Sequence, residues 1–145
     1  GNTAKRTGGG VFVENGTFTV SGKPTVNNNT SGSAEGSKVT DNVYLYPNKT
    51  ITIGSGLTEG TNIGVTTGSA KVPTEDSTVP IATATSNANG YLNYFKSDND
   101  SYKIVTNKEN TKLELKAKPQ ISLTKENTTI TIAVYNGANF KNAYR

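Results

Sequence analysis

The chain has 145 residues, of which 32% are hydrophobic, and a formal net charge of +4. That length suits one domain, or one domain and the start of another, while modest charge and abundant Val, Ile and Thr argue against intrinsic disorder. It contains neither Cys nor His, which excludes disulfides, thiolate and imidazole metal sites and the Ser-His-Asp triad. We therefore expect a non-catalytic protein without cofactor or metal.

The positive charge is spread along strands rather than gathered into one patch. Most lysines lie between Lys96 and Lys141, often alternating with apolar residues, as in residues 112–116 (KLELK). This spacing places them on a solvated strand face, where they also discourage edge-to-edge aggregation. The clustered arginines and interleaved aromatic residues of a nucleic-acid-binding surface are missing, so we expect no nucleic-acid partner.

No apolar run reaches the roughly 18 residues that a membrane-spanning helix needs, so we expect no membrane span here. The chain does not begin with Met, which suggests a piece of a longer protein. We expect it to be monomeric.

The first strand signal lies at residues 11–22 (VFVENGTFTVSG), where apolar residues alternate on each side of Asn15-Gly16. Asn-Gly between two such runs is typical of a tight hairpin, but it also suits the corner between two faces of one β-helix coil. The residues alone leave both open. In residues 24–41, Val26 predicts one more short strand, only Val26 and Val39 are expected to reach a core, and residues 27–38 predict a protruding loop.

The clearest pattern lies at residues 43–67 (VYLYPNKTITIGSGLTEGTNIGVTT). Alternation with a period of two buries one face of a strand, and turn residues roughly every 8–12 positions indicate an all-β fold. The segment predicts three strands, each with two apolar residues on one face: Val43 and Leu45, Ile51 and Ile53, Ile63 and Val65.

Residues 68–90 are irregular, with Val79 and Ile81 as expected core anchors and a short helical turn predicted within residues 82–90. The outline shared by residues 11–22 and 43–56 is an apolar pair, a turn, a second pair alternating with Thr, and another turn. It returns more faintly at residues 102–118 and 121–134. Such self-similarity is typical of a solenoid, in which each unit buries its face on a neighbour.

The last segment, residues 119–145, starts with Pro119, which interrupts the strand pattern. It contains two further strand signals. Either it caps the open end of the stack of coils, which we favour because solenoids need capped ends, or it begins a following module.

Several of these segments resemble the Gly-, Thr- and Asn-rich repeats of large adhesin-like surface proteins of Gram-positive gut anaerobes. Those repeats form right-handed parallel β-helices like that of pectate lyases. The resemblance covers roughly residues 8–118 and rests on GGGVFV, GTFTVSG and VNNNTS, then on NVYLYPNKTITIGSGLTEGTNIGVTT (42–67) and FKSDNDSYKIV (95–105). It implies an extracellular protein of the cell surface or cell wall with a structural or adhesive role. We expect a short right-handed parallel β-helix over residues 1–118 and a β-rich piece over residues 119–145.

The candidate ligand-binding residues are Tyr44 and Tyr46, because strand alternation places them opposite Val43 and Leu45. Exposed aromatic rings on a flat sheet stack on sugars or anchor a protein, so we expect a glycan or a host or bacterial surface protein as partner. The alternative is that stacked coils bury both rings.

Polysaccharide lyases and hydrolases also use the β-helix, and the acidic pairs of this chain are the candidates for a catalytic or calcium site. Asp98 with Asp100 suits either calcium or an ordinary Asp-Asn-Asp turn, and we expect the turn. Glu75 and Asp76 are expected in a solvated loop. The sequence favours a non-catalytic structural or adhesive module, and the alternative is a carbohydrate-binding or glycan-active β-helix fragment.

Overall fold

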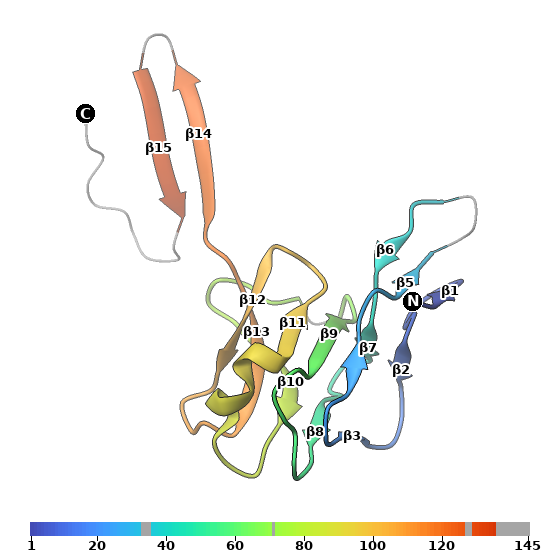
Figure 1. Cartoon of the computed structure of the whole chain (residues 1–145). Helices are drawn as coiled ribbons and strands as arrows, with labels where there is room; N and C mark the ends of the chain where they lie inside the picture. The colour runs from blue at the N-terminus through green and yellow to red at the C-terminus, as the bar shows by residue number, and fades with distance from the viewer. Residues whose placement is uncertain (33–35, 71, 127–128, 136–145) are drawn as a thin grey trace.

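The computed structural model describes residues 1–32, 36–70, 72–126 and 129–135, and these residues are built mainly from short strands (Figure 1). The described part contains one helix, the 3₁₀ helix η1 (Ala88–Tyr94). The predicted all-β class is confirmed. The helical turn expected within residues 82–90 was placed too early, because strand β10 (Val79–Thr83) occupies part of that range.

One sheet, here called the β7 sheet, is parallel throughout. Its order is β11 (Phe95–Ser97), β9 (Asn62–Thr67), β7 (Val43–Leu45) and β2 (Val11–Val13), with β4 (Thr25–Val26) beside the first part of β9. Equivalent apolar residues lie in register on neighbouring strands: Val11 pairs with Val43, Val43 with Val65, and Val13 with Leu45.

A second sheet, here called the β8 sheet, changes direction part-way across. Its order is β12 (Tyr102–Thr106), β13 (Lys112–Ala117), β10, β8 (Ile51–Ile53) and β3 (Phe18–Val20). Strands β3, β8 and β10 are parallel, with Ile51 in register with both Phe18 and Ala82. The pairs β10–β13 and β13–β12 are antiparallel.

The chain winds alternately between these two sheets, from β2 to β3, from β7 to β8 and from β9 to β10, and each pass adds a neighbouring strand to both sheets (Figure 1). Asn15-Gly16 is therefore a corner between two sheets and not a hairpin. Gly16 has a φ of 73° at this corner, with open space around the position of a Cβ. A left-handed backbone of this kind is adopted most readily by glycine.

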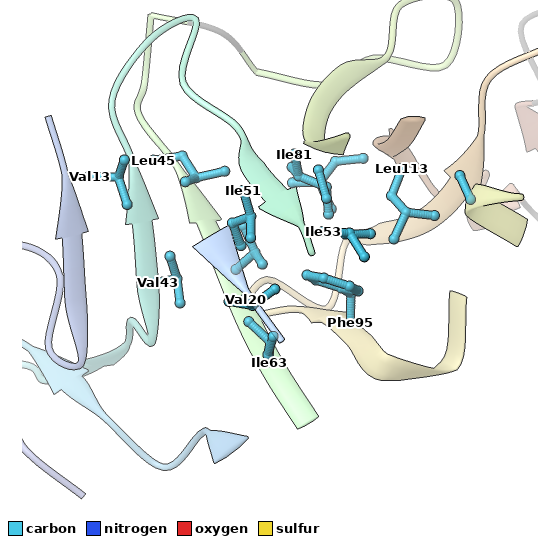
Figure 2. Close-up of a cluster of buried hydrophobic side chains, with 14 of the residues drawn as sticks. Val13, Val20, Val43, Leu45, Ile51, Ile53, Ile63, Ile81, Phe95 and Leu113 are labelled. Atoms are coloured by element: carbon cyan, nitrogen blue, oxygen red, sulfur yellow. The ribbon is translucent and has the colours of Figure 1, made fainter. Parts of the chain in front are cut away.

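The core consists of side chains from both sheets that form one cluster (Figure 2). All three strands predicted in residues 43–67 are present, and their apolar residues are buried as expected. Val79 and Ile81 are buried too, as predicted. Residues with no measurable exposure include Val43, Ile51, Ile63, Val65, Ile81 and Leu113.

The two faint repeats near the C-terminus do not form parallel coils, so that part of the prediction is wrong. Residues 102–118 form the antiparallel pair β12–β13, because the Asn107 side chain closes the connecting turn. Its Oδ1 accepts hydrogen bonds from the backbone N–H groups of Thr111 (2.9 Å) and Lys112 (2.8 Å). Residues 121–134 fall in the antiparallel hairpin of β14 (Gln120–Glu126) and β15 (Thr129–Tyr135), which projects away from the two sheets (Figure 1).

The loop expected at residues 27–38 is only partly a loop. Strand β5 (Thr30–Ser31) lies within it and pairs with β1 (Thr3–Ala4) and β6 (Val39–Thr40), while residues 33–35 lie outside the described residues. The prediction for Val39 is also wrong, since 57% of this residue is exposed. Polar Asn29 and Ser31 are buried instead, and the hydrogen bonds described below explain how Asn29 is accommodated.

Candidate functional site

The outer face of the β7 sheet carries two different surfaces, one aromatic and one polar. Strand alternation buries Val13, Val43 and Leu45, leaves Val11 half-buried, and turns Phe12 and Tyr44 outward. Register then aligns Phe12 with Tyr44, and Tyr44 with Thr66 on β9. Tyr46 follows two residues after Tyr44, and its N–H donates to the carbonyl of Val13 (3.0 Å).

The aromatic surface is a hollow of about 610 Å³, here called the aromatic hollow, lined by Arg6, Thr7, Phe12, Glu14, Tyr44 and Tyr46. The rings of Phe12 and Tyr44 lie 5.5 Å apart between centroids and are tilted by 43°. Phe12 is 45% exposed and Tyr46 48% exposed, while Tyr44 is half-buried. The outward orientation predicted for both tyrosines is thus confirmed, and the stacking of coils does not bury Tyr46.

Four residues that line this hollow, Arg6, Thr7, Phe12 and Glu14, were not predicted from the sequence. Phe12 was detectable, because the segments VFV and VYL occupy the same place in the repeated outline and so align Phe12 with Tyr44. Glu14 was detectable too, because it lies two residues after Phe12 and alternation turns both to the same side of the sheet. Arg6 gave no signal, because it lies outside the alternating pattern and reaches the hollow only through the path of the N-terminal segment.

The polar surface begins at Asn42, immediately before β7, and is here called the polar ladder (Asn2, Asn29, Asn42, Thr66 and Asp98). The Asn42 Oδ1 accepts from the backbone N–H (2.8 Å) and Nδ2 (3.0 Å) of Asn29. The Asn29 Oδ1 accepts from the backbone N–H of Asn2 (2.9 Å). Buried polar groups are tolerated when hydrogen bonds replace those to water, and the ladder supplies them across segments distant in sequence.

Asp98 ends the ladder on the far side of β9. Its Oδ1 accepts from Asn42 Nδ2 (2.6 Å), and its Oδ2 accepts from the Asn42 backbone N–H (2.7 Å) and from Thr66 Oγ1 (2.9 Å). This carboxylate reaches across Gly64, where a Cβ would collide with both Asn42 Nδ2 and Asp98 Oδ1. A residue without a side chain is required for that close approach.

These hydrogen bonds give Asp98 a structural role within the chain. Both Asp98 oxygens bind the chain itself, whereas Asp100 is exposed in the following turn, so the structure does not bring the two together as ligands. Within the described ranges, no group of three or more acidic residues is placed to hold a metal ion. Glu75 and Asp76 lie in the turn closed by the hydrogen bond from Thr74 N to Ser77 O (2.9 Å).

Comparisons of the chain with protein-family models, curated proteins and solved structures find no match. Across the part of the chain that the structure describes, no helix has the length and apolar character needed to cross a membrane.

Proposed function

We propose that this chain is a non-catalytic structural and adhesive module of a bacterial surface protein, exposed at the cell surface or cell wall. The observation that carries the proposal is the in-register parallel stacking of successive passes, with Val11 on Val43 and Phe18 on Ile51. A pass of this kind cannot bury its apolar face alone and needs a neighbour. Stacked passes make extended, rigid surfaces that serve as stalks and binding faces.

The same stacking supports a short parallel β-helix built from β2, β3 and β7 to β11, to which the antiparallel pair β12–β13 is added at one edge. The passes β2–β3, β7–β8 and β9–β10 each place a strand in the β7 sheet and the next in the β8 sheet, and the buried Asn42 links passes by its hydrogen bonds to Asn29 and Asp98. Parallel strands joined by a crossover are right-handed in about 98% of cases, which favours a right-handed coil.

Residues 119–145 are the second part of the chain in this proposal, after the stacked passes. Its described hairpin, β14–β15, pairs within itself and projects from the two sheets (Figure 1). That arrangement supports the start of a following module more than a cap lying on the stack.

A second candidate function is carbohydrate binding, and the aromatic hollow favours it. Phe12 and Tyr46 are nearly half exposed on a sheet face, which is where aromatic side chains serve recognition. Among the described residues that line the hollow, the single carboxylate is that of Glu14. Glycoside hydrolysis usually needs a pair of carboxylates across the bond, so binding suits this hollow better than cleavage.

The surface location is tested on intact cells of the bacterium that encodes the chain. Antibodies raised against the purified 145-residue chain are expected to label intact cells, and brief external protease treatment is expected to remove the signal. A cytoplasmic marker protein must survive the same treatment as the control. Labelling that appears only after lysis would refute the proposal.

A further inference from the structure

We propose that the aromatic hollow binds an uncharged glycan chain with flat, equatorially linked pyranose rings, as in β-1,4-linked glucose or N-acetylglucosamine polymers. This inference rests on the adhesive role proposed above and names its ligand class. It assigns binding roles to Phe12, Arg6, Thr7 and Glu14 in addition to Tyr44 and Tyr46.

The apolar part of the ligand is recognised by the rings. Tyr44 and Tyr46 are two residues apart, which in an extended strand is a separation of about 6.6 Å. Phe12 lies beside Tyr44 in register. The rings of Phe12 and Tyr44 are tilted by 43° to each other, and Tyr46 lines the same hollow. Equatorially linked pyranoses expose flat C–H faces that pack on such rings, while their hydroxyl groups stay at the rim.

The polar part of the ligand is recognised by Arg6, Glu14 and Thr7, which line the same hollow. Arg presents a fork of donors, a carboxylate presents acceptors, and the Thr hydroxyl does both. A sugar hydroxyl both donates and accepts, so it can satisfy each of them. The formal charges of Arg6 and Glu14 sum to zero, so the lining carries no net attraction for an anionic or a cationic ligand.

The site is also held in place before any ligand arrives. Tyr44 lies on β7, which is paired with β2 on one side and β9 on the other, and its neighbours Val43 and Leu45 are anchored in the core. A preformed surface loses little conformational entropy on binding.

The test is calorimetric titration of the full chain with four probes: cellohexaose, chitohexaose, hexagalacturonate and choline. We expect at least one neutral hexasaccharide to bind, with hexagalacturonate at least about tenfold weaker. Tyr46→Ala should weaken binding about tenfold or more, because a buried aromatic contact is worth more than about 1.4 kcal/mol. Tyr46→Phe keeps the ring and should stay within about threefold of the wild type. Val72→Ala, an exposed change outside the hollow, should have no effect.

Glu14→Gln separates a glycan from a cationic ligand of an aromatic cage. The amide keeps an acceptor for a sugar hydroxyl group but accepts more weakly than the carboxylate, so neutral-glycan binding should weaken by only about threefold, whereas choline would lose its counter-charge and bind about tenfold or more weakly. The inference is overturned if the folded chain binds neither neutral hexasaccharide, if it binds hexagalacturonate as tightly, or if Tyr46→Ala binds like the wild type. Choline binding that is lost in Glu14→Gln would overturn it as well. Any of these results leaves the surface-module proposal standing, since that proposal fails only on intact cells.

Discussion

The residues at the two ends of β7 face the same side of the sheet, yet one is buried and the other is exposed. Asn42, just before the strand, is 3% exposed, whereas Tyr46, just after it, is 48% exposed. The polar residue is inside and the aromatic residue is outside. This inversion of the usual preference separates a part of the surface that holds the passes together from a part that is free to meet a partner.

The difference arises from what lies beside each end. At Asn42 the neighbouring strand offers Gly64, so Asp98 can reach across, and Asn29 approaches from the segment between β4 and β5. At Tyr44 the neighbours in register are Phe12 and Thr66, and the rings themselves line the hollow. Neighbouring residues, and not the hydrophobicity of the residue itself, decide which end is buried.

The largest expected effect comes from breaking the ladder at Asp98. In Asp98→Ala, three hydrogen bonds are lost and two buried donors of Asn42 lose their acceptor. Unsatisfied buried donors cost about 1–3 kcal/mol each, so we expect the free energy of unfolding to fall by about 3 kcal/mol. Urea unfolding followed by circular dichroism measures this loss.

Asp100→Ala is the matched control, because this neighbouring carboxylate is exposed. It should change the free energy of unfolding by no more than about 0.5 kcal/mol. Equal small effects for both variants would show that the ladder does not hold the passes together.

A smaller effect is expected from filling the space over Gly64. In Gly64→Ala the new methyl group meets Asn42 Nδ2 and Asp98 Oδ1 and forces them apart. Overpacking of this kind costs about 1–3 kcal/mol. In the double variant Gly64→Ala with Asp98→Ala, the free energy of unfolding should fall by less than the sum of the two single losses. The reason is that the carboxylate that the methyl group displaces is already gone. Strict additivity, again by urea unfolding, would contradict the proposed steric conflict.

Much of the fold was predictable because it depends on local alternation. The strand pairs in residues 43–67 and the anchors Val79 and Ile81 followed from side chains that alternate between core and solvent. The corner at Gly16 and the hairpin at Asn107 were not predictable, because the same kinds of turn residue occur in corners and in hairpins. What distinguishes them is whether the next strand pairs back or crosses to the other sheet, which depends on contacts distant in sequence.

The candidate site shows the same division. Alternation alone predicted that Tyr44 and Tyr46 face outward, and their role in binding stays a prediction. The hydrogen-bonding partner of Asp98 lies 56 positions away in the chain, so its structural role required the register of β7, β9 and β11 together. Arg6 enters the hollow from a segment without any periodic pattern.

The smallest expected effect on stability is at the aromatic end, and it sharpens the contrast most. Tyr46→Ala removes a ring that is nearly half in water, so the free energy of unfolding should change by about 0.5 kcal/mol or less. Tyr44→Ala should cost more, about 1 kcal/mol, because its ring is half-buried and loses its contact with Phe12. Thermal and urea unfolding measure both variants. If Tyr46→Ala proved as damaging as Asp98→Ala, the aromatic hollow would be part of what holds the sheet together. A near-neutral result instead means that folding gains little from this exposed ring, which leaves it free to serve recognition.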